Sequence, residues 1–143
     1  MWNSVLYKQL INSILIAKRS RKNILIVEDD GIQQIIMERL ASRLNLNVVG
    51  IVASGAEAVR IADSINDLDL IMMDVRLGDD VDGIEAMTRI RKGSNSVKVI
   101  YITGNTEEET RNRAIQTDFE AFLEKPITEE QLKHAVSEAF ATV

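Results

Sequence analysis

The sequence contains no cysteine, and it has only one proline, one histidine and 4% aromatic residues. The absence of cysteine excludes disulfides, a thiolate metal site and a cysteine nucleophile. Because aromatic residues are scarce, a hydrophobic core has to be built from Ile, Leu, Val, Met and Ala. With 143 residues, of which 45% are hydrophobic and 27% charged, the chain has the size and composition of one soluble globular domain.

Charge is distributed unevenly along the chain. Residues 1–22 contain five Lys/Arg residues and no acidic residue, whereas residues 23–143 contain twelve Lys/Arg and twenty-two Asp/Glu residues. The acidic part is expected to repel nucleic acid and to attract a divalent cation. In the initial apolar stretch the positive charges follow the apolar residues, which is unlike a secretion signal, and the stretch is too short and interrupted to span a bilayer. We therefore expect a cytoplasmic protein.

After residue 22, short apolar runs alternate with helical patterns, and this alternation predicts a parallel sheet with helices on both faces. Strands are expected at 23–28, 47–53, 68–74, 97–103 and 119–124, and helices at 31–44, 55–65, 83–92, 106–116 and 128–141. Ser54 and Thr128 are candidate helix caps, with Glu57 and Gln131 at the capping-box positions. The predicted fold is a five-stranded, doubly wound α/β domain over residues 23–143.

Residues 1–22 are predicted to form an amphipathic helical extension, because Leu6, Tyr7, Leu10, Ile11 and Ile14 share one face of a helix. Three roles remain open for it. The helix could pack on its own domain, pair with a second copy of the chain, or lie on a membrane surface with its basic end, 18–22, near anionic lipids. We rank the first two equally and ahead of the third.

Chemically active side chains follow four of the expected strands. They are Glu28, Asp29 and Asp30 after the first strand, Asp74 after the third, Thr103 at the end of the fourth, and Lys125 after the fifth. Ligands of a doubly wound sheet bind outside the carboxyl ends of its strands. Carboxylates crowded there require a cation, and an all-oxygen ligand set favours Mg²⁺. Asp74 beside Mg²⁺ and Lys125 then has the setting of a carboxylate nucleophile that forms an aspartyl phosphate, with Thr103 donating to a phosphoryl oxygen.

The motifs "ILIVEDD", "DLIMMDVRL", "VIYITG" and "FLEKPI" resemble those of the receiver domain of two-component response regulators, the CheY-like superfamily. The resemblance runs from about residue 23 to the C-terminus, and it implies a flavodoxin-like fold with strand order 2-1-3-4-5. It implies that Asp74 is the phosphoacceptor and a metal ligand, that Asp29 binds Mg²⁺ directly, and that Glu28 does so directly or through water. The backbone carbonyl of Arg76 is a further expected ligand.

The same resemblance assigns the remaining residues of the site. Thr103 is the expected switch hydroxyl, Lys125 the phosphate-binding lysine and Phe122 the switch aromatic residue. The Lys125–Pro126 peptide bond is a candidate for the cis form. Asp30 is expected to cap the helix that follows it.

Three departures from the family pattern concern the lifetime of the phosphoryl group. The loop "VRLGDDVDG" after Asp74 is one residue longer than usual and lacks the usual proline. Arg76 places a long cation two residues beyond the phosphoacceptor. Asn105, two residues beyond Thr103, occupies the other position that tunes dephosphorylation in this family.

The sequence is therefore interpreted as a single-domain response regulator and not as an enzyme with a separate substrate. It would take its phosphoryl group from a histidine kinase or a phosphotransfer protein, and phosphorylation would change the surface formed by 106–116, 119–124 and 128–141 for a downstream protein.

The alternative is a receiver-like interaction module that is never phosphorylated. A phosphatase of the haloacid dehalogenase type would need a second acid at the position of Arg76. His134, at a polar helix position, is expected to be solvated.

Overall fold

The computed structural model of the protein describes residues 3–141, except for the side chains of residues 17–20. In chain order the elements are α1 (Ser4–Ser20), β1 (Asn23–Val27), α2 (Gly31–Arg43), β2 (Asn47–Val52), α3 (Gly55–Ser64), β3 (Leu70–Met73), α4 (Gly83–Lys92), β4 (Lys98–Thr103), α5 (Glu108–Ile115), β5 (Ala121–Glu124) and α6 (Glu129–Ala139). Each strand and helix lies where the alternating pattern predicted it, with ends that differ by a few residues.

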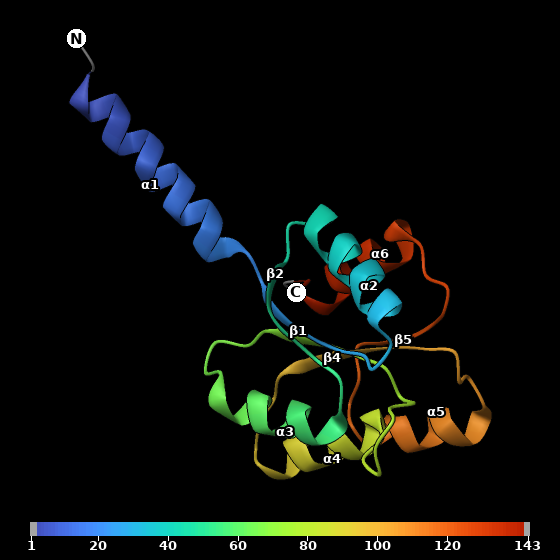
Figure 1. Ribbon diagram of the computed structural model, residues 1–143. Helices are drawn as coiled ribbons and strands as arrows, with labels where there is room; N and C mark the ends of the chain where they lie inside the picture. The colour runs from blue at the N-terminus through green and yellow to red at the C-terminus, as the bar shows by residue number, and fades with distance from the viewer. Residues whose placement is uncertain (1–2, 142–143) are drawn as a thin grey trace.

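The five strands form one parallel sheet in the order β2-β1-β3-β4-β5. Helices α2 and α6 cover one face of the sheet, and α3, α4 and α5 cover the other (Figure 1). The predicted doubly wound, flavodoxin-like fold is confirmed. Strand order reverses between β1 and β3, so the carboxyl ends of these two strands flank the crevice in which such sheets bind ligands.

Side chains of the central strands alternate between two hydrophobic cores. Leu25 and Val27 of β1 point to the core beneath α3 and α4, whereas Ile24 and Ile26 join the core beneath α2 and α6. All four residues are fully buried. Burial on both faces explains why the strands are apolar throughout and do not alternate with polar residues.

Helices α2, α3, α4 and α6 begin at side-chain caps, as the sequence predicted for α2, α3 and α6, whereas α5 begins without one. Ser54 Oγ accepts a hydrogen bond from the Glu57 N–H at 3.2 Å, and Thr128 forms a full capping box with Gln131. Asp30 caps α2 by accepting from the N–H groups of Ile32 and Gln33. These caps fix where each helix begins relative to the strand before it.

The helix α1 extends away from the domain (Figure 1). Its apolar side chains are exposed, with Leu6 at 63% and Leu10 at 56% of their possible surface. Packing on its own domain, one of the three roles predicted for this helix, is therefore wrong for this structure, because none of the described strands or helices lies against its apolar face. Among the described residues, no helix is long and apolar enough to cross a membrane.

Candidate functional site

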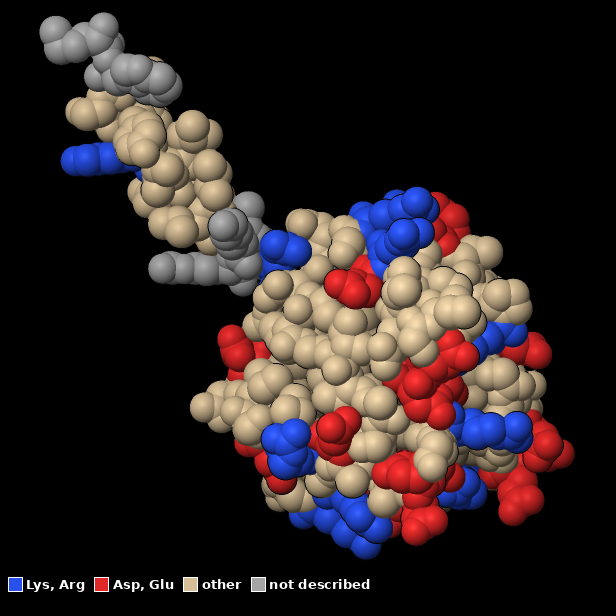
Figure 2. Space-filling model, viewed as in Figure 1, with Lys and Arg blue, Asp and Glu red and all other residues tan. Residues whose placement is uncertain are grey.

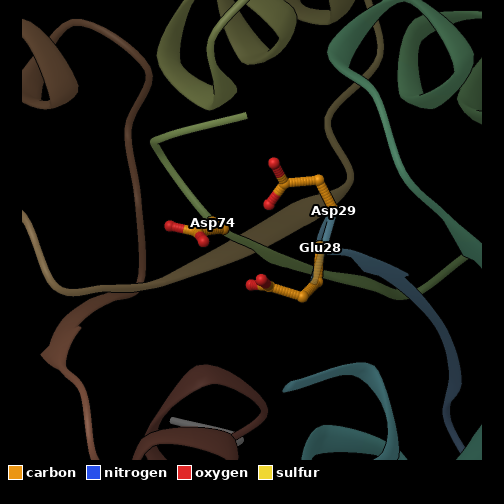
Figure 3. Close-up of side chains that lie close together, drawn as sticks. All are labelled: Glu28, Asp29 and Asp74. Carbon is orange, nitrogen blue, oxygen red and sulfur yellow. The ribbon is translucent and has the colours of Figure 1, made fainter. Parts of the chain in front are cut away.

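Three carboxylates meet at the carboxyl ends of β1 and β3. Glu28 and Asp29 directly follow β1, Asp74 directly follows β3, and their side chains point toward a common space (Figure 3). One carboxylate oxygen from each lies within 4.8 Å of the other two. Glu28 and Asp74 are 1% and 5% exposed, whereas Asp29 is exposed. All three were predicted from the sequence to lie at this edge, and the structure brings them together.

Backbone hydrogen bonds continue the sheet through the first residue beyond each strand. The Glu28 N–H donates to the Val52 carbonyl, and the Asp74 N–H donates to the Val27 carbonyl, both at 3.0 Å. The two carboxyl groups therefore leave from backbone positions that the sheet itself fixes. Such fixed positions favour a precise binding site over a mobile surface pair.

Lys125 lies between the two buried acids. Its Nζ is 2.7 Å from Glu28 Oε2 and 2.9 Å from Asp74 Oδ2. The Lys125 N–H donates to the Thr103 carbonyl at 3.0 Å, which extends the pairing of β4 and β5 by one residue. The Lys125–Pro126 peptide bond is cis, as the resemblance to the receiver family implied.

The charges of this cluster do not balance. The pKa of Glu28 is raised to about 7, mainly by burial and further by the neighbouring Asp74, with Lys125 opposing both effects. Burial lowers the pKa of Lys125, but its bonds to Glu28 and Asp74 outweigh that effect and raise it overall. When ionised, the three carboxylates leave two negative charges that the single ammonium does not neutralise. A divalent cation would neutralise them.

The donor set fits magnesium. All three side chains offer carboxylate oxygens, and neither histidine nor cysteine lies among the residues that form the cluster. Hard oxygen ligands of this kind favour Mg²⁺ or a similar cation over zinc. Two of the carboxylates are buried and held by Lys125, whereas the third, that of Asp29, is exposed.

A cavity of about 360 Å³ opens beside the acids. It is lined by Glu28, Asp30, Gln33, Asp74, Arg76, Thr103, Gly104, Asn105 and Lys125. Thr103 is fully buried, and its Oγ1 accepts from the Asn105 N–H at 3.1 Å. The Arg76 N–H donates to Asp74 Oδ1 at 3.3 Å. Thus every residue assigned to the site from the sequence lies in the cluster or lines the cavity, except Phe122 and Pro126.

Phe122 lies outside this cavity lining. Its ring packs against Tyr101 and Phe119, with centroid distances of 5.7 and 5.8 Å, and the Arg111 guanidinium lies 5.2 Å above it. The Tyr101 hydroxyl in turn shares a 2.7 Å hydrogen bond with Thr117 Oγ1. The side chain is half-buried in an aromatic cluster on the face of the sheet that α3, α4 and α5 cover. His134 is exposed, as expected.

Two residues that support the site were missed by sequence reasoning. Gly83, the first residue of α4, lies so close to Asp74 that a Cβ atom there would be 2.0 Å from the Asp74 carbonyl oxygen. Gln34 Nε2 donates to the Glu28 carbonyl at 2.6 Å. The position of Gly83 could have been inferred in part from the sequence, because it directly follows Asp82, which caps α4. Nothing in the sequence indicates the hydrogen bond from Gln34 to Glu28.

Comparisons with known proteins agree with this geometry. The family model of the response regulator receiver domain matches residues 24–137. The chain is 34% identical over 114 residues to the response regulator protein VraR of Staphylococcus aureus, an alignment that covers 79% of this chain. It covers 54% of VraR, so the chain spans about half the length of the curated relatives it matches.

Solved structures with the same fold include two receiver domains. One belongs to a sensor histidine kinase of Pseudomonas aeruginosa, in which a magnesium ion is coordinated in the active site cleft. It is 30% identical, with a TM-score of 0.71, and the match covers 82% of this chain and 96% of that one. The other is the signal receiver domain of a modulated diguanylate cyclase of Desulfovibrio desulfuricans, at 28% identity and a TM-score of 0.76, covering 84% and 94%.

Proposed function

Because this chain belongs to the response regulator receiver domain family of two-component signalling, we propose that Asp74 accepts a phosphoryl group from the phosphohistidine of a kinase or phosphotransfer protein. One observation carries the proposal. Lys125 bridges two buried carboxylates, Glu28 and Asp74, while the carboxylate of Asp29 lies within reach of both. A purely structural module has no need of this arrangement, since buried charges are costly.

In the proposed reaction, an oxygen of the Asp74 carboxylate bonds to phosphorus while the phosphorus–nitrogen bond of the donor breaks. The imidazole leaves with the bonding electron pair and is protonated by solvent. Lys125, 2.9 Å from Asp74 Oδ2, would balance the negative charge that arrives with the phosphoryl group. Thr103 has a hydroxyl hydrogen at the cavity to donate to a phosphoryl oxygen.

Glu28, Asp29, Asp74 and the backbone carbonyl of Arg76 are the proposed ligands of Mg²⁺, which when bound neutralises charge on the transferring group. The excess of negative charge at these carboxylates supports the assignment. The magnesium ion described for the related Pseudomonas receiver domain supports it further. Arg76 and Asn105, which line the same cavity, are proposed to set how fast water removes the phosphoryl group.

Phosphorylation is proposed to act as a switch. Thr103 would move toward the phosphoryl group, and Phe122 would turn from its aromatic cluster into the space that Thr103 leaves. The surface of α5, β5 and α6 would then change its preference for a downstream protein, as a shift between two existing states. We propose residues 23–143 as this receiver domain and residues 1–22 as a separate extension. A cytoplasmic location and the lack of nucleic-acid binding stay predictions.

An exposed apolar patch beside the site supports a protein as the phosphoryl donor. Ile32, Ile35 and Ile36 of α2 are 71%, 52% and 43% exposed. Ile32 lies in the first turn of α2, two residues beyond Asp30, which lines the cavity. A donor that reaches Asp74 would pass this patch, and exposed apolar residues next to a reaction site are typical of protein contacts.

The test is phosphorylation by acetyl phosphate in the presence of Mg²⁺, followed by intact-mass spectrometry. We expect one added phosphoryl group in the parent protein, none after chelation of the metal, and none in Asp74→Asn. This variant keeps the size of the side chain and removes the nucleophilic carboxylate. Undiminished labelling of Asp74→Asn would reject the assigned site, and no labelling of the parent would favour the interaction module that is never phosphorylated.

A further inference from the structure

The helix α1 extends away from the domain (Figures 1 and 2), and its apolar side chains are exposed among the residues that the structure describes. Eight large apolar residues between Val5 and Ile16 are each at least 37% exposed, and Ile16 reaches 64%. Isolated exposed apolar residues need no explanation, but a contiguous set on one element marks an interaction surface. The question is which partner its shape and charge fit.

The apolar residues form a wide face. At 3.6 residues per turn, six of them share roughly half of the helix circumference. These six are Leu6, Tyr7, Leu10, Ile11, Ile14 and Leu15. Gln9, Asn12 and Ser13 lie on the opposite side. A two-helix coiled coil buries only a narrow stripe and normally continues over at least about three heptads. Pairing α1 with a second copy would leave much of this face in water.

The charge of the segment also disfavours a second copy. The helix contains Lys8, Lys18 and Arg19 and no acidic residue, and Arg21 and Lys22 follow it directly. The side chains of Lys18 and Arg19 lie outside the described residues, but both contribute positive charge to the segment. Two such helices side by side would repel each other, whereas an anionic lipid surface would attract every one of these charges.

The junction with the domain suits attachment to a surface. The Arg21 guanidinium donates to the carbonyls of Asn45 and Leu46 at 3.3 and 3.2 Å, and Lys22 Nζ lies 4.8 Å from the Phe140 ring centroid. These contacts hold the end of α1 near the amino end of β1. The acidic cluster lies at the carboxyl ends of the strands, so a surface bound to α1 leaves it open to solvent.

We propose that α1 lies in the plane of an anionic membrane surface, with its wide apolar face in the boundary between headgroups and acyl chains and its basic end among the headgroups. The rest of the chain, with ten more acidic than basic residues over 23–143, would be held off the same surface by repulsion. This proposal reverses the ranking that the sequence alone gave, because the structure leaves the helix unpacked and its apolar face wide.

The test is flotation of the full chain with vesicles of phosphatidylcholine alone and with about one quarter phosphatidylglycerol. Two variants in the same turn add the same charge at different places: Leu10→Glu on the apolar face of the helix and Gln9→Glu on its polar face. We expect binding to the anionic vesicles, much weaker binding to the neutral ones, and a loss of at least about tenfold in partitioning for Leu10→Glu compared with Gln9→Glu.

Several results would overturn the proposal. One is the absence of flotation with anionic vesicles, and another is an equal effect of the two variants, which would leave charge alone as the cause of binding. A third is a lipid-free dimer in sedimentation that Leu10→Glu abolishes and Gln9→Glu retains, which would assign the apolar face to a second copy. Thermal melting of both variants checks that the domain stays folded.

Discussion

The two ends of the sheet depart from ordinary protein surfaces in opposite ways. At the carboxyl ends of the strands, the charged groups of Glu28 and Asp74 are buried around Lys125. At the amino end of β1, the preceding helix α1 leaves Leu6 and Leu10 more than half exposed. Charged groups are normally solvated and large apolar groups are normally buried. Here one end of the sheet has buried charged groups, and the other end has exposed apolar groups.

The difference lies in what each departure costs the folded domain. Burying the charges affects the sheet directly, because Glu28 and Asp74 continue the ladders of β1 and β3. Among the described residues every buried side-chain nitrogen or oxygen has a hydrogen-bond partner, so the cost comes from unbalanced charge and not from missing hydrogen bonds. Exposing the apolar face of α1 leaves the two cores of the sheet untouched.

Removing the ammonium of Lys125 is expected to have the largest effect on stability. Lys125→Met keeps the aliphatic part of the side chain and leaves two buried carboxylates without their cation, which should lower the free energy of unfolding by about 3 kcal/mol. The matched control is Lys98→Met, which breaks an exposed pair with Glu120 and should cost less than about 1 kcal/mol. Urea unfolding measures both, and equal losses would contradict a special role for the buried pair.

Gly83→Ala is expected to destabilise the domain by about 2 kcal/mol, because the new Cβ has to move the Asp74 backbone or α4 itself. The same change at Gly31, where a Cβ would meet no atom within 4 Å, is the control. We also expect Gly83→Ala to slow labelling by acetyl phosphate. If the variant has the stability and the labelling rate of the parent, the close contact between α4 and the Asp74 backbone matters neither for stability nor for the reaction.

Glu28→Gln is expected to stabilise the metal-free protein by about 1–2 kcal/mol at about pH 8. The pKa of Glu28 is raised to about 7 from 4.5, so the folded state binds this proton more tightly than the unfolded state does. Stability of the parent should therefore fall as pH rises from about 4.5 to about 7, and the variant should lack that fall. Urea unfolding at about pH 5 and about pH 8 measures the difference. A constant difference between the two proteins would contradict the raised pKa.

Leu10→Glu is expected to have the smallest effect, a change within about 0.5 kcal/mol in the free energy of unfolding without lipid. The side chain lies on a helix face that contacts neither core, so its replacement alters no buried surface. Urea unfolding beside the parent checks this result. A loss as large as that of Lys125→Met would show that α1 packs on the domain in solution and would remove the contrast between the two ends.

The fold could be predicted because it depends on local patterns. The apolar strands ended at Glu28 and Asp74, and a parallel sheet brings the carboxyl ends of its strands to one edge, so the position of the acids followed from the order of the elements. The cap at Thr128 followed from the spacing of two residues. Patterns of this kind can be read from the sequence because they involve residues that are close together in the chain.

Features that depend on packing could not be predicted. The contact between Gly83 and Asp74 joins a helix to a strand end, and it exists only once α4 lies across the sheet. The aromatic cluster around Phe122 requires Tyr101 and Phe119 to lie on the same face of the sheet. The position of α1 is a similar case, because its amphipathic pattern left open whether it packs on the domain, on a second copy or on lipid, and ranked lipid last.

The central claim, that this acidic edge makes Asp74 a phosphoacceptor, is tested most directly by locating the modified residue. Borohydride reduces an acyl phosphate of aspartate to homoserine, and peptide mass spectrometry then identifies its position. After treatment with acetyl phosphate and Mg²⁺ we predict homoserine at residue 74 and an unchanged residue 29. Homoserine at residue 29 instead, or no conversion at either position, would contradict the account.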